Sequence, residues 1–259
     1  MDRAVAQRPR PGVGRRLAGA EIDDWSLRHG CRLWIVRLDD LAPGVQLGAV
    51  LSPRERLRAS RVLDAGRRER YVRGRAALRA LLGAALGVRA AAVELSEGDA
   101  GKPRLACEAG LSFNVSHSGS LALIGLTRIG AIGVDIQTAR APRTARGLAR
   151  RCFHRVEART LCSLPPPLQA DAFLRCWTVK EAVVKALGVG LAERLDRVVV
   201  EADPRVPLRL REVPGQVRAS RWSVYELAVD GARLAIALPS PDVAIAGVSE
   251  LDWGAVVGA

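Results

Sequence analysis

The stretch WTVKEAVVKA, residues 177–186, is the strongest indication of fold in this chain. It contains no glycine or proline and is predicted to form a helix. Trp177, Glu181 and Lys185 recur every four residues and therefore share one face of that helix. On a solvated face, Glu181 and Lys185 would form an ordinary ion pair worth about 0.2–0.5 kcal/mol. The tryptophan and the two adjacent valines favour burial instead, and a buried Glu–Lys pair indicates a functional site.

A second stretch, GVDIQ at residues 133–137, alternates in polarity as a strand does. Asp135 and Gln137 then point to one side, about 7 Å apart, and Gly133 beside them leaves room for a ligand. An acid flanked by aliphatic residues in a central strand is costly to bury unless it is paired or holds a cation. The alternative is an aspartate at a strand end whose carboxylate accepts hydrogen bonds from backbone N–H groups.

Residues 101–103 (GKP) and 113–118 (FNVSHS) contribute a third polar group. A strand that runs into Ser116 and His117 places a hydroxyl, an imidazole and flexible backbone N–H groups at a turn, which suits the binding of phosphate. An ordinary surface histidine is the alternative. A Ser–His catalytic pair is only weakly indicated, because no GxSxG turn precedes it.

The rest of the pattern mixes helices with short strands. Ser52 is a predicted N-cap followed by a proline, and a second helix over residues 65–86 is predicted to stop at Gly87. Residues 119–126 resemble residues 231–238, which fits two similar halves, although strands rich in Ala and Leu commonly look alike. Strands are predicted at residues 111–115, 121–126, 132–136 and in short runs from 197 onward, and helices at 152–162 and 169–187, separated by prolines 165–167.

Composition bounds the class of protein. The chain has 259 residues, 49% of them hydrophobic, so a globular fold is expected. Its net charge of +13 calls for a polyanionic partner: nucleic acid, an acidic membrane, a phosphate-rich small molecule or an acidic protein surface. No apolar run approaches the roughly 20 residues of a membrane span, and the basic arm at residues 1–20 lacks the apolar segment of a secretory signal, so a soluble, cytoplasmic protein is expected.

Cysteine and lysine usage narrow the chemistry. The five cysteines form no CxxC pair, which argues against a zinc or redox site and favours buried, structural thiols. Only three of the 40 basic residues are lysines, and Lys102, Lys180 and Lys185 all lie in the stretches quoted above. This placement indicates sites where a compact ammonium is needed rather than a planar guanidinium. Three lysines left by chance in a chain from a GC-rich genome are the alternative.

Together these stretches resemble the Sfp-type 4′-phosphopantetheinyl transferases over about residues 50–200. The W-x-x-K-E-A-x-x-K-A motif after a G-V-D-I strand is highly specific. The resemblance implies an α+β fold of two pseudo-symmetric halves, residues 21–132 and 133–259, each with helices packed on an antiparallel sheet, and a ligand in the cleft between them. The matching segments, in order, are Ser52-Pro53, Arg70-Tyr71, Gly74-Arg75, Leu78-Arg79 and residues 101–103, 113–118, 133–136, 153–157, 177–186 and 188–191.

The resemblance also implies a reaction and its residues. The enzyme would transfer the 4′-phosphopantetheine arm of coenzyme A, with Mg²⁺ as cofactor, to a serine of an apo carrier protein, releasing adenosine 3′,5′-bisphosphate. Asp135 and Glu181 would coordinate the Mg²⁺, and Lys185 and Lys180 would neutralise charge on the transferred phosphate. Glu181 or a metal-bound water would accept the proton of the serine. The nucleotide end would be held by Arg58, Arg70, Arg75, Lys102, Ser116 and His117.

One position departs from the family pattern. Many members carry a second acid where this chain has Gln137. An amide oxygen is a weaker ligand for a hard cation than a carboxylate. Gln137 is therefore expected to bind the metal through water or not at all.

The expected partners are coenzyme A and an acidic apo carrier protein of the fatty-acid, polyketide or nonribosomal-peptide class, and a monomer without affinity for nucleic acid or membrane is expected. Two alternatives remain open. A nucleic-acid-binding protein would explain the charge but not Asp135 or Glu181, and the chain has no recognised binding motif and few aromatic residues for stacking. A relative that has lost catalysis and only binds coenzyme A or a carrier protein is supported by Gln137 alone.

Overall fold

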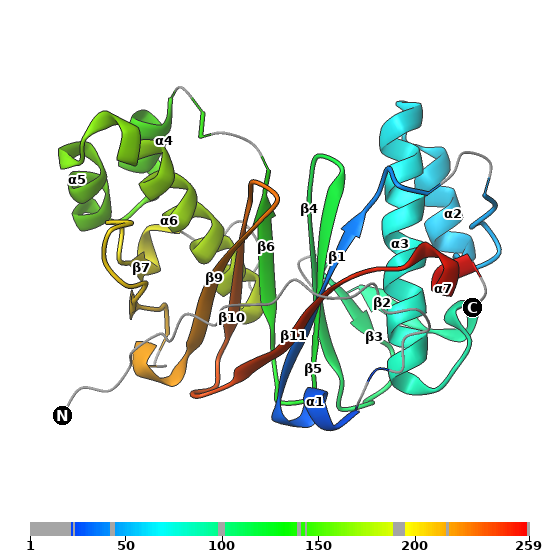
Figure 1. Ribbon diagram of the computed structural model, residues 1–259. Coiled ribbons are helices and arrows are strands. Elements are labelled where there is room, and N and C mark those ends of the chain that lie inside the picture. The colour runs from blue at the N-terminus through cyan, green and yellow to red at the C-terminus, as the bar shows by residue number, and fades with distance from the viewer. Residues whose placement is uncertain are drawn as a thin grey trace.

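The computed structural model is an α+β fold in which two sheets lie side by side with helices packed on them (Figure 1). None of the helices it describes is long and apolar enough to cross a membrane. The predicted basic arm, and residues 189–191 of the last matching segment, lie outside the described residues. The structure describes residue 22 and residues 24–41, 45–97, 102–138, 141–142, 144–188, 195–215 and 218–257.

The larger sheet has the strand order β11-β1-β5-β4. Strand β5 pairs antiparallel with both β1 and β4, whereas β11 pairs parallel with β1. Its strands are β1 (Gly30–Arg37), β4 (Ser112–Ser118), β5 (Leu121–Thr127) and β11 (Ala244–Glu250). The elements packed around it are α1 (Asp24–His29), α2 (Pro53–Ser60), α3 (Ala65–Leu86), the hairpin β2 (Leu95–Glu97) and β3 (Pro103–Leu105), and α7 (Trp253–Val257).

The smaller sheet has the order β6-β10-β9 and is antiparallel. The long helix α6 packs on it through an apolar cluster that includes Val179, Val183 and Ala235. The elements of this half are α4 (Ala145–Cys152), α5 (Arg155–Ser163), α6 (Pro166–Leu187), β6 (Gly133–Gln137), β7 (Val199–Val200), β8 (Leu210–Glu212), β9 (Ser223–Val229) and β10 (Ala232–Leu238).

Local signals fix the ends of the helices that carry the site. Ser52 and Glu55 form a capping box that starts α2, as the predicted N-cap at Ser52 requires. Asp64 caps α3 through the amide of Arg67, and Gly87 ends it in the left-handed conformation with φ 69°. The prediction of a helix over residues 65–86 that stops at Gly87 is confirmed.

The two sheets meet where β4 lies beside β6. No backbone ladder joins these strands among the described residues; side chains of β4 bind the backbone of β6 instead. Asn114 Oδ1 accepts from the amide of Val134 at 2.9 Å, and Ser116 Oγ accepts from that of Ile136 at 3.4 Å. These bonds satisfy buried N–H groups at the junction. They also fix the height of Ser116 relative to β6.

The halves repeat one another in form. Helices α3 and α6 both have 22 residues, and each ends at a left-handed glycine, Gly87 or Gly188. The hairpins β4–β5 and β9–β10 both turn at a glycine with positive φ, Gly119 or Gly231. The internal repeat therefore corresponds to β5 and β10. Across the predicted boundary at residue 133, however, β11 and α7 return from the second half of the sequence to the first sheet.

Three sequence predictions need correction or addition. The helix predicted at residues 152–162 is wrong at its start, because Phe153 is extended and buried and His154 opens a new capping box with Glu157, so the segment divides into α4 and α5. Strand β1 was not predicted. Of the five thiols expected to be buried, Cys31 and Cys176 are, whereas Cys107 is exposed.

Candidate functional site

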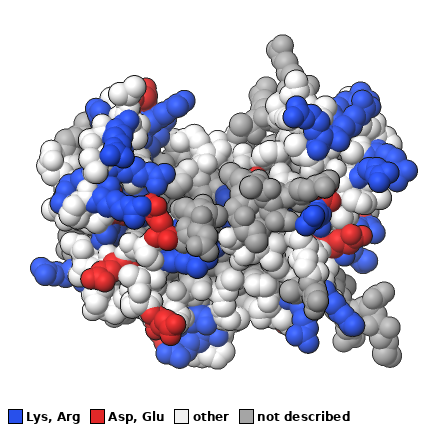
Figure 2. Space-filling model, turned by 180° about the vertical axis from the view of Figure 1, so that it is seen from behind, with Lys and Arg blue, Asp and Glu red and all other residues white. Residues whose placement is uncertain are grey.

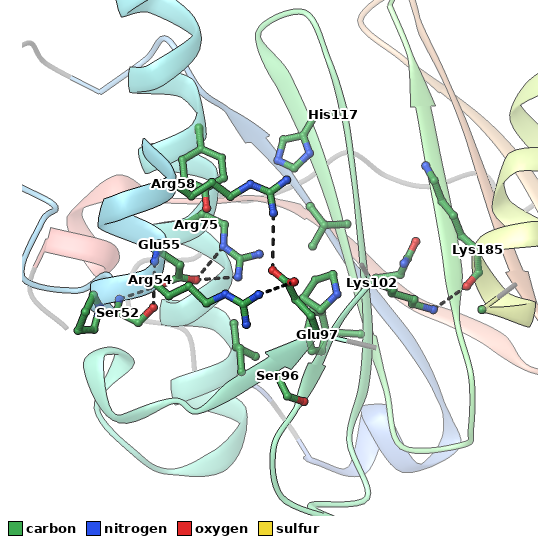
Figure 3. Close-up of a pocket in the computed structure, with 18 of the residues that line it drawn as sticks. Ser52, Arg54, Glu55, Arg58, Arg75, Ser96, Glu97, Lys102, His117 and Lys185 are labelled. Carbon is green, nitrogen blue, oxygen red and sulfur yellow. Dashed lines mark hydrogen bonds and ion pairs between the residues drawn. The ribbon is translucent and has the colours of Figure 1, made fainter. Parts of the chain in front are cut away.

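A cavity of about 830 Å³ lies between the two halves, bounded by α2, α3, β2, β4 and α6 (Figure 3). Its lining is strongly cationic. Arg54 and Arg58 come from α2, Arg75 from α3, and Lys185 from α6. Lys102 precedes β3 and also faces the cavity. A cavity of this size and charge suits a small molecule with several phosphate groups.

At the α2–α3 end, buried ion pairs orient one arginine toward the cavity. Glu55 is 6% exposed and binds Arg75 at 2.7 Å and Arg79 Nε at 2.6 Å. Its carboxylate also accepts the amide of Ser52 at 2.8 Å as part of the α2 capping box. One carboxylate thus links the start of α2 to the middle of α3 and positions Arg75.

Toward α6, the ammonium of Lys102 faces the cavity, whereas the imidazole of His117 faces it from beside α3. Lys102 Nζ donates to the carbonyl of Lys185 at 2.6 Å. Burial, followed by the positive charges of Arg104 and Lys185, lowers the pKa of Lys102 to about 8. His117 is exposed, but partial desolvation at the cavity wall, followed by the positive charges of Lys185 and Arg75, lowers its pKa, so the imidazole is neutral at pH 7 and can donate one hydrogen bond to an anion.

Beside the cavity, three groups from β4, β6 and α6 converge on Asp135. Lys185 Nζ lies 2.6 Å from Asp135 Oδ1, and Ser116 Oγ donates to the same oxygen at 2.7 Å. Gln137 Nε2 donates to Asp135 Oδ2 at 3.0 Å. Burial raises the pKa of Glu181 to about 7; Asp135 adds to this rise, and Lys185 opposes it. The structure therefore brings Asp135, Glu181 and Lys185 together, as the family resemblance implies.

The two carboxylates fit a shared Mg²⁺. Within the described residues, no group of three or more Asp, Glu, His or Cys side chains could hold a metal alone. Mg²⁺, however, is commonly bound by one or two carboxylates together with substrate phosphates and water. Glu181 is 5% exposed, accepts no hydrogen bond from the described residues, and lies close enough to Asp135 for their charges to interact. This donor set fits a cation that also contacts a bound phosphate.

The structure does not bring every predicted residue to the cavity. Arg70 lies outside it and pairs with Asp39 at 2.8 Å. Lys180 is fully buried on another face of α6, where its ammonium lies 2.7 Å from Glu157 Oε2 and binds the carbonyl of Leu195 at 2.9 Å. Helical periodicity explains the position of Lys180, because it precedes Glu181 by one residue and adjacent residues of a helix point about 100° apart. Ser116 holds Asp135 rather than lining the cavity.

Three charged lining residues are not among the predicted site residues: Arg54, Glu97 and Glu55, which positions Arg75. Arg54 lies one turn before Arg58 on α2, so helical spacing could have indicated it. Glu97 ends β2 and projects among the arginines of α2. No sequence signal pairs it with them, since Glu97 lies 43 positions after Arg54 and helix α3 separates the two elements.

The chain is similar to known protein families and to individual proteins. Residues 131–238 match the family described as "4′-phosphopantetheinyl transferase superfamily", and residues 44–127 match "4′-phosphopantetheinyl transferase, N-terminal". The 4′-phosphopantetheinyl transferase HetI of Nostoc sp. is 37% identical over 76% of this chain and 82% of its own length. The putative 4′-phosphopantetheinyl transferase slr0495 of Synechocystis sp. is 36% identical over 65% of this chain and 69% of its own.

More distant proteins also match. The human L-aminoadipate-semialdehyde dehydrogenase-phosphopantetheinyl transferase is 28% identical over 74% of this chain and 68% of its own. Among solved structures, Thermotoga maritima holo-[acyl-carrier-protein] synthase aligns over 41% of this chain and 61% of its own at 21% identity, with a TM-score of 0.32. A likeness that partial carries no argument about the site.

Proposed function

This chain belongs to the 4′-phosphopantetheinyl transferase superfamily, enzymes that transfer phosphopantetheine onto carrier proteins, and on that premise we propose that it uses coenzyme A and Mg²⁺ to modify a carrier-protein serine. The serine oxygen attacks the phosphorus next to pantetheine, and the bond from that phosphorus to the bridging oxygen breaks. Adenosine 3′,5′-bisphosphate leaves. The proton of the serine passes to a carboxylate or to water.

The observation that carries this proposal is the Asp135, Glu181 and Lys185 cluster at the edge of a cationic cavity. Phosphoryl transfer depends mainly on positioning and on stabilising charge at the transferred group and the leaving oxygen. Mg²⁺ held by Asp135 and Glu181 would supply that stabilisation at the pyrophosphate. Lys185 already lies beside Asp135, so its ammonium is in place to bind an oxygen of the same phosphate.

The remaining roles follow from position. Arg75, Lys102 and His117 face the cavity and would bind the phosphates of the nucleotide end, together with Arg58. Glu181 is the proposed proton acceptor, and a metal-bound water is the alternative, because a carboxylate that coordinates Mg²⁺ is a weaker base. Lys180 and Arg70 are placed away from the cavity, and we assign Lys180 the structural role of joining α6 to α5 through Glu157.

The proposed protein partner is an acidic apo carrier protein. Figure 2 shows Lys and Arg side chains gathered over the two ends of the molecule, which α2–α3 and α4–α5 form in Figure 1. On α4 and α5 five arginines are exposed, and none has an ion-pair partner among the described residues. Such surfaces attract an acidic protein and speed encounter. These arginines are Arg146, Arg150, Arg151, Arg155 and Arg159.

The experiment that tests the proposed function is intact mass spectrometry of an apo carrier protein. After incubation with this protein, coenzyme A and Mg²⁺, we expect a gain equal to one phosphopantetheine group, and no gain when EDTA replaces Mg²⁺. Carrier proteins of the fatty-acid, polyketide and nonribosomal-peptide classes should be tried in parallel. No gain with any of them would contradict the proposal and favour a protein that binds coenzyme A without reacting.

A glycine on α3 makes room for His117, which gives a second prediction. Alanine at a helix interior normally stabilises by about 1 kcal/mol over glycine. A β-carbon at Gly74 would lie only 2.9 Å from His117 Nε2, however, so the imidazole would have to move. For Gly74→Ala we expect coenzyme A to bind roughly three- to tenfold more weakly by calorimetry, the equivalent of one lost hydrogen bond, while the free energy of unfolding is unchanged or higher.

Two further variants test whether the loss of affinity for coenzyme A arises from displacement of His117. Gly66→Ala lies on the same helix, where a β-carbon would meet only Asp64 Oδ1 at 3.6 Å, and it should leave binding unchanged. In a His117→Ala background, Gly74→Ala should cost nothing further. An equal loss of affinity with and without the imidazole would show that Gly74 acts in another way.

A further inference from the structure

Glu97 is a carboxylate in a cavity otherwise suited to anions. It ends β2, and its side chain is 40% exposed. Its Oε2 lies 2.6 Å from Arg54 Nη2, and its Oε1 lies 3.8 Å from Arg58 Nη1. Figure 3 shows Glu97 between these two arginines and the rest of the cavity, with both ion pairs marked. The carboxylate of Glu97 therefore already neutralises part of the positive charge that Arg54 and Arg58 bring to the cavity.

The position of this cluster indicates which part of the ligand it meets. Lys185 and Asp135 mark the end of the cavity where the phosphoryl group is transferred, if the proposed function holds. Arg54 and Arg58 lie on the side toward α2, away from Lys185 (Figure 3). Apart from its pyrophosphate, coenzyme A has one charged group, the phosphate on the 3′ oxygen of its ribose. That phosphate lies at the end of the molecule remote from the group transferred.

We propose that Glu97 competes with the ribose 3′-phosphate of coenzyme A for Arg54 and Arg58 and so sets how strongly this enzyme distinguishes coenzyme A from 3′-dephospho-coenzyme A. This inference rests on the proposed function. A phosphate dianion that approaches the two guanidinium groups must share them with the carboxylate or displace it. Either outcome weakens binding of the 3′-phosphorylated ligand. A ligand without that phosphate leaves these ion pairs intact, so the competition does not lower its affinity.

The expected size of the effect follows from the exposure of the cluster. Arg54 and Arg58 have side chains that are 71% and 67% exposed, so the ion pairs are screened by solvent and Glu97 can turn aside. The competition therefore lowers affinity without preventing binding. Removing one like charge beside a bound phosphate should tighten binding about three- to tenfold at low salt.

The test compares two ligands and three proteins by isothermal titration calorimetry in low-salt buffer. Glu97→Gln removes the charge and keeps the shape of the side chain. The matched control is Glu94→Gln, an exposed glutamate three residues earlier that does not line the cavity. We expect Glu97→Gln to bind coenzyme A three- to tenfold more tightly than the wild type does and 3′-dephospho-coenzyme A with an unchanged dissociation constant. Glu94→Gln should match the wild type for both ligands.

Each contrary result has a distinct meaning. Equal tightening of both ligands would overturn the inference, because Glu97 would then act through the general charge of the cavity. Weaker binding of coenzyme A would also overturn it and would show that Glu97 holds the arginines in place for the phosphate. If the wild type modifies a carrier protein but the ligand preference of Glu97→Gln is unchanged, this inference alone fails. If the wild type binds neither ligand and modifies no carrier, the proposed function fails first.

Discussion

Asp135→Asn should lower the rate of phosphopantetheinyl transfer on the order of a thousandfold, because a metal ion contributes several kcal/mol of charge stabilisation to such reactions. Asparagine keeps the shape of the side chain, and its single oxygen can still accept the hydrogen bond from Ser116, while its amide nitrogen replaces the oxygen that accepts from Gln137. It removes the negative charge that pairs with Lys185 at 2.6 Å and that would coordinate Mg²⁺ with Glu181. The variant should therefore lose the metal site and the charge that holds the ammonium in position.

The measurement is the rate of mass gain of an apo carrier protein over a range of Mg²⁺ concentrations. Asp39→Asn is the matched control, since Asp39 pairs with Arg70 away from the cavity, and its rate should stay within about twofold of the wild type. A melting curve of Asp135→Asn is needed as well, because breaking an ion pair that is 3% exposed on one side can destabilise the fold. A folded Asp135→Asn protein with near-normal activity at saturating Mg²⁺ would exclude Asp135 as a metal ligand.

Local sequence signals predicted much of the fold. Helix α3 is predicted over residues 65–86 and occupies Ala65–Leu86, because its apolar residues recur at helical spacing and Gly87 marks its end. Strand β1 was not predicted. It is buried on both faces, so its side chains do not alternate in polarity and show no period. The return of β11 to pair with β1 could not be predicted either, since no local pattern encodes a parallel contact across more than 200 residues.

The residues of the site also fall into those that the sequence predicts and those that only the structure shows. Strand and helix periods indicate the faces that carry Asp135, Glu181 and Lys185, which is local information, whereas the resemblance alone implies that these residues form one site. Lys180 was assigned to the phosphate through the resemblance alone, although a helix directs it about 100° from Glu181, and here it lies with Glu157. The position of Glu97, in contrast, cannot be predicted from local sequence. Its contact with α2 depends on where the β2–β3 hairpin packs, and only the structure shows that.

Among the glycines that the structure describes, Gly133 is the one where an added methyl group would meet backbone most closely, so Gly133→Ala should cause a large loss of stability or of activity. Gly133 begins β6 and faces α6, and a β-carbon there would collide with the carbonyl oxygen of Ala182 and lie 2.5 Å from the amide nitrogen of Ala186. Both atoms belong to the backbone of α6, so no flexible side chain can move aside. Either the free energy of unfolding falls by about 3 kcal/mol, or α6 shifts away from β6.

A shift of α6 would separate the groups that the proposed reaction needs together. Asp135 lies on β6, whereas Glu181 and Lys185 lie on α6, and the contact at Gly133 sets the spacing between these two elements. A displacement of about 1 Å can reduce catalysis roughly a hundredfold. We therefore expect any Gly133→Ala protein that folds to modify its carrier about a hundredfold more slowly, as measured by the mass assay, and to unfold at lower denaturant concentration.

The control is a glycine at which an added β-carbon would contact no other atom. Gly147 on α4 has no atom within 4 Å of that position, so Gly147→Ala should leave transfer unchanged and stabilise the fold by up to about 1 kcal/mol. If Gly133→Ala equalled the wild type in both stability and rate, the close packing of β6 on α6 would not be what holds Asp135 near Lys185. A loss of both would show that the close packing at Gly133, in addition to the Asp135–Lys185 ion pair, fixes the geometry of the site.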